Sequence, residues 1–569
     1  MHSSALSVEQ RSEALDRITT QELDVLIIGG GVTGVGCALD AATRGLTVGL
    51  VEQRDYAAGT SSRSSKLIHG GLRYLEQFNF RLVFEALGER GLLLEELCPH
   101  LVRPVSFLYP LKHKYWERPY VGAGIALYDA LASAKGNPLP LHRHLSRSGV
   151  AKRFPSVDTE KIAGGIIYWD AQVDDARHTM SIARTAARFG AWLAPSTRVV
   201  DLIHEGDRVV GAVLDDLEGG RRLEARAKQV VNATGVWTDS IQDMGGKGKI
   251  KVNASKGIHL VVPRDRINAD TGVILRTEKS VLFVIPWGEH WIVGTTDTSW
   301  DLDLSHPAAS RSDIDYLLEH VNSVLTDPLS HDDIVGVYAG LRPLLTGESD
   351  DTSKLSREHA VSQVVPGLIS IAGGKYTTYR VMAEDTIDAV VRNLGREVPD
   401  SPTGSTPLVG ADGYHGLWNG RARISRRAGL PIETVEHLLG RYGSMIDEVL
   451  ALIDEQADLG RPLDGGAGHL RAEIVYACRN EGALHLDDVL TRRTRISIET
   501  ADRGLAVSDE VADLMAGVLG WDSGGIEREL AHYRARVEAE LESQRMPDDR
   551  TADAARLGAP DVRFAPGAG

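Results

Sequence analysis

The sequence has few cysteines, no excess of basic residues and no long apolar run. Its 569 residues include three cysteines, Cys37, Cys98 and Cys478, and none of them forms a C-x-x-C pair. This spacing argues against a disulfide framework and against a structural zinc site, and we expect no bound metal. No segment approaches the roughly 18 apolar residues that a membrane-spanning helix needs. The first twenty residues lack the apolar core of a signal peptide, so we expect no secretory signal.

The charge balance is acidic, with 79 Asp and Glu residues against 63 Lys and Arg residues and a formal net charge of -16. Broad nucleic-acid binding needs a basic surface that displaces counterions from phosphates, so we expect no nucleic-acid partner. The composition, 42% hydrophobic and 25% charged, is typical of a soluble globular protein, and a cytoplasmic location is expected. A chain of this length is expected to contain two or three domains.

A glycine-rich turn lies near the N-terminus, at residues 29–34 (GGGVTG). Residues 23–28 are predicted to form a buried strand before it, and apolar residues at spacings of three and four predict a helix over 33–44 after it. A second predicted strand, 47–51, leads to an acidic residue. In this order the glycines let a pyrophosphate reach the positive end of the helix, and the acid bonds a ribose hydroxyl. The predicted dinucleotide contacts are Gly29, Gly31, Thr33, Gly34 and Glu52.

Two later motifs favour FAD over NAD as the dinucleotide. Residues 230–235 (VVNATG) are predicted to be a strand that ends in Ala-Thr-Gly, which in two-dinucleotide-type flavoproteins returns the chain to the cofactor. Residues 373–375 (GGK) open a predicted helix and can present backbone N–H groups to an anionic ring or phosphate. We therefore expect FAD as the cofactor.

The pattern of elements predicts an α/β protein with a second sheet and a helical domain. Strand patterns at 258–263, 281–286 and 290–295 predict an antiparallel sheet, a further strand is predicted over 365–371, and the Pro- and Gly-rich stretch 398–413 predicts a linker. The expected parts are a flexible leader (1–20), a discontinuous Rossmann-like FAD-binding domain (21–85, 165–240 and 340–397), an amino-acid-oxidase-like substrate domain (86–164 and 241–339), a C-terminal all-helical domain (414–545) and a disordered tail (546–569).

Several motifs together resemble a known family. The sequence over about residues 22–500 is similar to the FAD-dependent, quinone-linked glycerol-3-phosphate dehydrogenases. The similar segments are 28–45 (IGGGVTGVGCALDAATRG), 60–75 (TSSRSSKLIHGGLRYL), 256–263 (KGIHLVVP), 294–297 (GTTD), 340–344 (GLRPL), 373–383 (GGKYTTYRVMA) and 490–495 (LTRRTR).

The resemblance implies oxidation of sn-glycerol 3-phosphate to dihydroxyacetone phosphate, with hydride transfer from C2 to FAD and electrons passed on to a membrane quinone. Arginine forks suit a dianionic phosphate, and the resemblance places Arg342 and Arg357 there. It places Arg73, Tyr74 and His259 in the substrate pocket. The further implied cofactor contacts are Thr60, Ser61, Ser62, Lys66, His69, Gly70, Gly235, Gly374, Lys375 and Thr377, of which Lys66 and His69 either touch the flavin or order its loop.

The predicted catalytic residues are Arg73, His259, Arg342 and Lys375. Arg73 and Arg342 would form a cationic wall that stabilises a developing alkoxide, and Lys375 would suit the anionic form of the reduced flavin. Loss of the hydroxyl proton would be helped by a base, for which His259 and His69 both remain candidates.

Two segments have uncertain roles. The basic and aromatic residues 112–118, followed by apolar residues 121–132, suit a helix at a membrane surface, and a core helix with a solvated basic start explains them equally well. An interfacial helix would associate the protein peripherally with the inner face of the cell membrane. The cluster 492–495 (RRTR) is either a solvated face or a domain contact, and we favour the contact. A homodimer is a further expectation.

Three other functions remain open at this stage. A glycerol-3-phosphate oxidase that uses oxygen would have the same site, although such oxidases typically carry an insertion that is not evident here. Another flavin-dependent amine or hydroxyacid oxidoreductase would need a carboxylate site in place of two phosphate-facing arginines. A non-catalytic scaffold or an RNA-modifying flavoprotein is disfavoured by the acidic charge balance.

Overall fold

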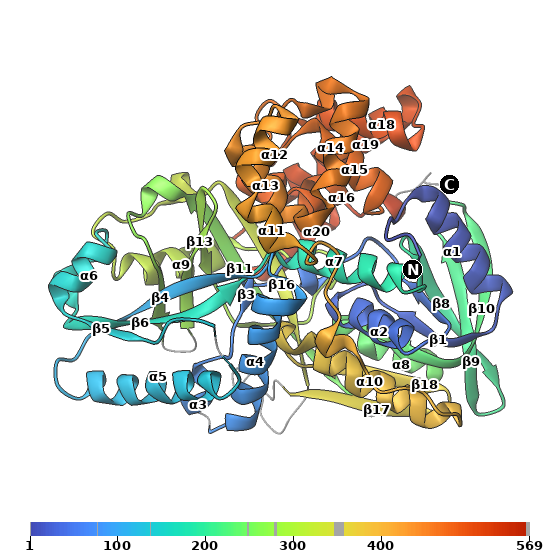
Figure 1. Cartoon of the computed structure of the whole chain (residues 1–569), viewed down its shortest axis with the longest axis horizontal. Coiled ribbons are helices and arrows are strands. Elements are labelled where there is room, and N and C mark those ends of the chain that lie inside the picture. The colour runs from blue at the N-terminus through green and yellow to red at the C-terminus, as the bar shows by residue number, and fades with distance from the viewer. Residues whose placement is uncertain are drawn as a thin grey trace.

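The computed structural model describes residues 2–564 except Gln77, Asn137, Lys247, Lys249, 278–280 and 346–357. Two sheets lie side by side, and a group of helices from the C-terminal part of the chain sits above the place where they meet (Figure 1). The predicted architecture is confirmed: an α/β part with a parallel sheet, an antiparallel second sheet and a C-terminal helical domain.

The first sheet is built on parallel strands in the order β18-β10-β1-β2-β7. Strand β1 (Leu23–Ile28) is buried on both faces because its side chains alternate between two cores. Val25 and Ile27 pack with the helices on one face, while Leu26 and Ile28 pack with α1 and the β8–β9–β10 strands on the other. The remaining elements of this part are α2 (Val32–Thr43), β2 (Val48–Val51), α7 (Asp175–Arg188), β7 (Trp192–Ala194), β8 (Thr197–Glu205), β9 (Arg208–Asp216), β10 (Arg221–Asn232), α8 (Thr238–Gly245), β18 (Leu368–Gly373) and α10 (Tyr379–Leu394).

The second sheet is mostly antiparallel, and β11 (Val252–Pro263) pairs with β14, β15 and β16. Ile258 and Leu260 face a core closed by α9, whereas Val261 faces a core closed by α4 and α5. The antiparallel sheet predicted from 258–263, 281–286 and 290–295 is therefore confirmed. Its other elements are β3 (Leu67–Ile68), α3 (Arg73–Glu76), α4 (Phe80–Leu92), β4 (Arg103–Leu111), α5 (Glu117–Ser133), β5 (Arg143–Leu145), α6 (Arg147–Arg153), β6 (Gly164–Gln172), β12 (Gly272–Arg276), β13 (Val281–Trp287), β14 (His290–Gly294), β15 (Thr298–Trp300), α9 (Arg311–Asn322) and β16 (Gly336–Leu345).

One predicted strand is a hairpin. The segment 365–371 was expected to be continuous, but β17 (His359–Val365) ends where the expected strand begins and pairs antiparallel with β18. Pro366 and Gly367 form the turn between them, and Gly367 adopts a φ of 86° that favours glycine. The Pro-Gly pair is the sequence signal that predicts this turn.

The flexible leader predicted for residues 1–20 is wrong for most of that segment, because Val8–Thr20 forms helix α1. Ser7 and Gln10 form a capping box at its start, and Arg11 pairs with Asp216 at 2.6 Å. Leu15 and Ile18, three residues apart and therefore on one face, are buried against the first sheet. The helix is ordered because its apolar side chains cover an apolar face of the sheet. The mainly polar composition of residues 1–20 hides these few apolar positions.

The disordered tail predicted for 546–569 is also wrong for the residues that the structure describes. Asp549–Leu557 forms helix α20, which Asp548 caps by accepting from the backbone N–H of Thr551. Arg563 is buried and pairs with Asp488 at 2.8 Å. Residues 565–569 lie outside the described part of the chain.

The C-terminal helices are held against the FAD-binding part by buried ion pairs. Arg492 and Arg493 both pair with Asp55, which follows strand β2, at 2.5 and 2.7 Å. The domain contact favoured for 492–495 is therefore confirmed. The helices of this domain are α11 (Tyr414–Asn419), α12 (Arg421–Ala428), α13 (Ile432–Tyr442), α14 (Ile446–Glu455), α15 (Arg471–Asn480), α16 (Leu486–Asp488), α17 (Ile496–Glu499), α18 (Ser508–Leu519) and α19 (Ser523–Ser543).

His485 bridges the same interface and makes stability depend on pH. Its Nδ1 lies 2.8 Å from Glu529 of the helical domain, and its Nε2 lies 3.0 Å from Glu218 after strand β9. Burial and Arg563 act to lower the pKa of His485, but the hydrogen bonds to the two carboxylates outweigh them and raise it to about 10. Because the pKa is higher in the folded state, protonated His485 stabilises the fold. This stabilisation is complete below the unfolded pKa of about 6.5 and is lost as the pH rises towards 10.

We therefore expect the free energy of unfolding to decrease by on the order of a few kcal/mol as the pH rises from 7 to 10. The midpoint temperature of thermal unfolding should fall over the same range. The His485→Gln variant should be less stable at pH 7 and should show a shallower fall over this window. His415→Gln, at an exposed position of α11, is the matched control and should follow the parent protein. Parallel pH curves for the parent and His485→Gln would contradict the assignment.

Candidate functional site

A cavity of about 430 Å³ lies where the carboxyl ends of β1, β2 and β10 meet the second sheet. Parallel strands end at one edge of their sheet, and this edge is where ligands bind in open α/β folds. The wall is built by the glycine loop and by four segments that are distant in sequence. These are 59–65, 233–237, 340–344 and 373–377.

The glycine loop brings the first turn of α2 against strand β10. Gly29 has a φ of 113°, and a Cβ there would lie 2.7 Å from the carbonyl oxygen of Ala233. A Cβ on Gly34 would overlap the carbonyl oxygen of Gly29. Helix α2 begins after Gly31 without a side-chain cap, so its first turn presents backbone N–H groups and the positive end of the helix dipole at the cavity. This cradle fits a pyrophosphate.

Glu52 stands on the cavity wall at the end of strand β2. Its Oε2 accepts a hydrogen bond from the backbone N–H of Gly30 at 2.7 Å, and its Oε1 accepts from that of Arg54 at 2.8 Å. Burial raises the pKa of Glu52 from its ordinary value. The two backbone bonds fix the carboxyl group in the orientation that a ribose hydroxyl would meet.

The segment 60–71 divides the predicted cofactor residues into two groups. Thr60, Ser61 and His69 line the cavity, and Thr60 Oγ1 donates to the carbonyl oxygen of Leu341 at 2.6 Å. The buried Lys66 points instead to Asp175, 2.8 Å away, so it orders the loop. Residues Ser62, Lys66 and Gly70, together with Gly34 of the first turn, are not on the cavity wall, whereas Gly29, Gly31, Thr33, Glu52, Gly235, Gly374, Lys375 and Thr377 are.

His259 lies on β11 at the end of the cavity nearest the second sheet. Its Nε2 lies 2.8 Å from Ser65 Oγ, and its ring stacks on Tyr338 with centroids 4.7 Å apart. Burial first, and then the cations of Arg342 and Lys66, hold the pKa of His259 well below its ordinary value. The imidazole is therefore neutral at neutral pH, and its buried Nδ1 has no hydrogen-bond partner among the described residues.

Arg342 is held on the cavity wall by groups from the β14–β15 connection. Its Nη2 donates to Thr295 Oγ1 and to the carbonyl oxygen of Thr296, both at 3.1 Å, and its Nη1 lies 3.6 Å from Asp297. Its side chain remains 22% exposed. These contacts fix the guanidinium in place, and Arg342 still lines the cavity, where it can meet an anion.

Lys375 brings a second cation to the same region. Its Nζ lies 3.7 Å from the centroid of the Tyr74 ring, and both residues line the cavity. The structure therefore assembles Tyr74, His259, Arg342 and Lys375 from four separate segments. Arg357 lies outside the described residues, and of Arg73 only the backbone, in α3, is described.

Among the cavity residues that were not predicted are two arginines of the cofactor loops, Arg54 and Arg63. Arg54 lies 5.6 Å over the ring of Trp237 and donates to the carbonyl oxygen of Ser305 at 3.1 Å. Arg63 lies in the middle of the Ser-rich segment. Each arginine is within two residues of a predicted cofactor contact, and this closeness was the sequence signal available.

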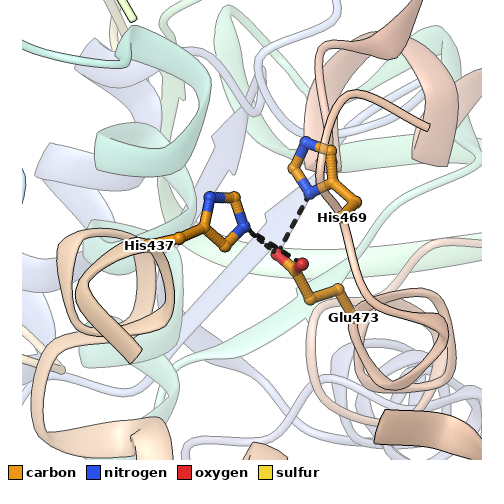
Figure 2. Close-up of side chains that lie close together, drawn as sticks. All are labelled: His437, His469 and Glu473. Carbon is orange, nitrogen blue, oxygen red and sulfur yellow. Dashed lines mark hydrogen bonds and ion pairs between the residues drawn. The ribbon is translucent and has the colours of Figure 1, made fainter. Parts of the chain in front are cut away.

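A second group of chemically active side chains lies in the helical domain, away from this cavity. His437 and His469 both point at the carboxylate of Glu473, each with a nitrogen 3.1 Å from Oε1, and the three could hold a metal ion by spacing alone (Figure 2). The same carboxylate also accepts from Tyr442 Oη at 3.0 Å and from the backbone N–H of Leu470 at 2.8 Å. These hydrogen bonds already account for a buried carboxylate, and they tie α13 to α15.

Comparison with known proteins places both parts of the chain. Residues 24–380 match the family model described as FAD dependent oxidoreductase, and residues 401–525 match the C-terminal domain of alpha-glycerophosphate oxidase. The chain is 57% identical over 561 residues to a glycerol-3-phosphate dehydrogenase of Mycobacterium leprae, covering 98% of this chain and 96% of the relative. It is 38% identical to the mitochondrial glycerol-3-phosphate dehydrogenase of Homo sapiens, covering 90% of this chain and 73% of that protein.

Among solved structures, the chain resembles the glycerol-3-phosphate dehydrogenase from Bacillus halodurans complexed with FAD. The TM-score is 0.77 at 30% identity, and the match covers 94% of this chain and 98% of that one. The L-alpha-glycerophosphate oxidase from Mycoplasma pneumoniae, with a TM-score of 0.53 and 18% identity, shares the fold over 68% of this chain.

Proposed function

The chain belongs to the family of FAD-dependent glycerol-3-phosphate dehydrogenases, and we propose that it oxidises sn-glycerol 3-phosphate to dihydroxyacetone phosphate. The observation that carries the proposal is that the Arg342 and Lys375 cations line the same cavity as the neutral imidazole of His259, with Arg342 near enough to lower the pKa of that imidazole. A phosphorylated secondary alcohol needs an anion site and a proton acceptor side by side, and this arrangement supplies both.

FAD is the cofactor. The residues that would hold it are those that line the cavity of about 430 Å³. The first turn of α2 would take the pyrophosphate, Glu52 would accept from a ribose hydroxyl, and the turn at Gly374 and Lys375 would face the ring end. When bound, FAD accepts the hydride that leaves C2 of the alcohol.

The phosphate group of the substrate is assigned to Arg342. A guanidinium bonds two oxygens of a phosphate at once, which fixes orientation as well as affinity. Thr295 and Thr296 set the direction of this fork. We assign Arg357 and Arg73 to the same pocket on the strength of the family motif.

The proton of the substrate hydroxyl is assigned to His259. Because Arg342 and burial keep its imidazole neutral, the ring is in the form that accepts a proton. Ser65 holds the ring through Nε2, and Tyr338 holds its plane. Lys375 adds positive charge where the alkoxide and the reduced cofactor develop negative charge. His69, which also lines the cavity, is the second candidate for the base.

The expected test of this function is a change of colour. Anaerobic addition of glycerol 3-phosphate to the yellow holoenzyme should bleach the flavin absorbance fully, whereas glycerol, which lacks the phosphate, should leave it unchanged. A holoenzyme that stays yellow with glycerol 3-phosphate would rule the proposal out. Reoxidation of the bleached enzyme that is much faster with a quinone than with air would favour the dehydrogenase over an oxidase.

The electron acceptor is assigned to a membrane quinone, reached from a surface that we call the α5 patch. It comprises the exposed aromatic side chains of Tyr115, Trp116 and Tyr120 and the basic residues Lys112, Lys114 and Arg118. Tyr115 is 82% exposed and Trp116 is 59% exposed. The opposite face of α5 packs Ile125 and Tyr128 into the core. We therefore assign both roles to this helix, the core helix and the helix at a membrane surface. In Figure 1 this helix lies below strands β5 and β6 of the second sheet.

This surface supports peripheral association with the inner face of the cell membrane, since basic and aromatic side chains bind the headgroup region together. No helix of the described residues is long and apolar enough to cross a bilayer. The double variant Tyr115→Ser/Trp116→Ser should weaken binding to vesicles of mixed anionic and neutral phospholipid about 10- to 100-fold, measured by sedimentation. Phe189→Ser, at an exposed aromatic position of the FAD-binding part, is the control. Equal binding by both variants would remove the α5 patch from the proposal.

A further inference from the structure

A second, smaller cavity of about 90 Å³ lies between the helical domain and the cofactor loop. Its wall is made by residues 62–63, by 307–309 before α9, by strand β16, by Asp487 of α16 and residues 491–495, and by helices α17, α19 and α20. Cations dominate this wall, which carries five arginines and two acids. The arginines are Arg63, Arg492, Arg495, Arg536 and Arg556, and the acids are Asp487 and Glu540.

Two of these arginines are fully neutralised by the protein. Arg492 pairs with Asp55, Asp487 and Asp488. Arg495 pairs with Asp174 at 2.7 Å and with Asp175. These pairs use Asp487, and Glu540 already lies 3.2 Å from Arg503 and 3.8 Å from Arg556. The acids of the wall are therefore engaged elsewhere.

Arg63 and Arg536 have no carboxylate partner among the described residues. Arg536 is 8% exposed; its Nη1 lies 2.6 Å from His306 Nε2, and its buried Nε has no hydrogen-bond partner. Arg63 donates only to the carbonyl oxygen of Ser305, at 3.4 Å. Burial and then Arg536 hold the pKa of His306 well below the ordinary value, so its imidazole is neutral and does not balance the charge of Arg536. The half-buried Arg63 and the buried Arg536 thus share one cavity without a carboxylate partner among the described residues.

The cavity also holds a hydroxyl without a partner. Ser497, 7% exposed, lines the cavity, and its Oγ makes no hydrogen bond to the described residues. The arginines around Arg63 also repel its positive charge. Burial and these neighbours, Arg54 and Arg536 first among them, hold the pKa of Arg63 well below its ordinary value. Burial of unpaired charge and of an unsatisfied donor is costly, so groups of this kind mark a place for a ligand.

We infer that this cavity binds a small tetrahedral oxyanion, phosphate or the phosphoryl group of a small metabolite, between Arg63, Arg536 and Ser497. The volume admits such a group and excludes a nucleotide. The pyrophosphate of FAD does not account for Arg536, because Arg536 and Arg556 lie outside the wall of the larger cavity. Arg63 lines both cavities, so the anion would join the helical domain to the loop that bears Thr60 and Ser61. This site is separate from the substrate phosphate site at Arg342.

The test measures thermal unfolding of the FAD-loaded protein with and without inorganic phosphate. Because a ligand of the folded state raises stability by mass action, phosphate should raise the midpoint of the parent protein. To exclude binding at the substrate site, the experiment is repeated on the Arg342→Gln background, where we expect the shift to persist. Loss of the whole shift in Arg342→Gln would overturn the inference.

The variant Arg536→Met removes the charge and keeps the aliphatic stem. It should weaken phosphate binding about 10- to 100-fold, as expected for loss of a charge-assisted hydrogen bond, and in phosphate-free buffer it should keep or raise the midpoint, because an uncompensated charge is gone. Arg534→Met, exposed on the same helix and paired with Asp509, is the matched control and should bind like the parent. An equal drop of the midpoint with and without phosphate would show that Arg536 is only structural and would overturn the site.

If Arg536→Met does not fold, Ser497→Ala provides the second measurement. We expect this variant to bind phosphate more weakly than the parent, and unchanged binding would contradict the site. Comparison of phosphate with a hexose monophosphate then separates the two sources of the anion. Tighter binding of the free ion identifies inorganic phosphate, and tighter binding of the ester identifies a phosphorylated metabolite. Binding of neither to the Arg342→Gln protein would overturn the inference.

Discussion

Replacing Arg342 by alanine is expected to raise KM for glycerol 3-phosphate and lower kcat/KM by about 100- to 1,000-fold. The variant removes a charge-assisted fork from a partly buried phosphate site, which typically costs about 3–4 kcal/mol. Flavin content should stay near that of the parent, because Arg342 is assigned to the substrate end of the cavity. Steady-state kinetics with an artificial electron acceptor, together with the flavin absorbance, measures both quantities.

Two further variants sharpen this result. Arg342→Lys should recover only part of the loss, since an ammonium cannot bond two oxygens in the geometry of a guanidinium. Arg153→Ala, an exposed arginine of the second-sheet part paired with Asp270, should leave KM unchanged. If Arg342→Ala has the KM of the parent, the phosphate assignment fails, and the alternative of a carboxylate substrate becomes the better reading of the same cavity.

The parts of the fold and site that could be predicted from sequence are those with local causes. The turn at Gly29–Gly34 depends on the positive φ of Gly29 and on the close approach of Gly34 to the Gly29 carbonyl, and the apolar run before it predicts a buried strand from six letters. The resemblance to a family then carried the prediction to Arg342 and Lys375, which lie on the cavity wall more than 300 residues after the loop.

The parts that could not be predicted depend on partners distant in sequence. Lys66 was expected either to touch the flavin or to order its loop, and sequence could not decide because its partner Asp175 stands 109 positions away. The polar mean character of residues 1–20 predicts a leader, although Leu15 and Ile18 cover a sheet assembled from strands that lie between residues 23 and 373. Tertiary contacts decide such elements, and a window of sequence does not contain them.

The same reasoning explains why the two arginines of the smaller cavity were missed. An arginine in a loop is usually a solvated or paired charge, and the chain as a whole is acidic. Only the structure shows that Arg63 and Arg536, 473 positions apart in the chain, line one cavity while the nearby acids serve Arg492, Arg495 and Arg503. Local excess charge is thus independent of net charge.

Replacing Gly34 by alanine is expected to leave the protein largely without FAD. A methyl group at this position overlaps the carbonyl oxygen of Gly29, and neither the β1–α2 turn nor strand β10 behind it can give way without opening the cradle. Overpacking of this kind costs about 1–3 kcal/mol or more, so FAD affinity should fall at least about 10- to 100-fold. The flavin-to-protein absorbance ratio after gel filtration and titration with FAD measure the loss.

The matched control is Gly517→Ala, in the exposed interior of α18, where the added methyl group meets nothing within 4 Å. Alanine is the better helix former by about 1 kcal/mol, so this variant should keep its flavin and unfold at a slightly higher temperature. A Gly34→Ala protein that retains FAD like the parent would show that the turn can relax, and it would shift the explanation of cofactor binding from the glycine loop to Glu52 and the segment 60–65. Because the substrate residues reach the cavity from the second sheet, Gly34→Ala should lose flavin while keeping the fold of that sheet, which circular dichroism can verify.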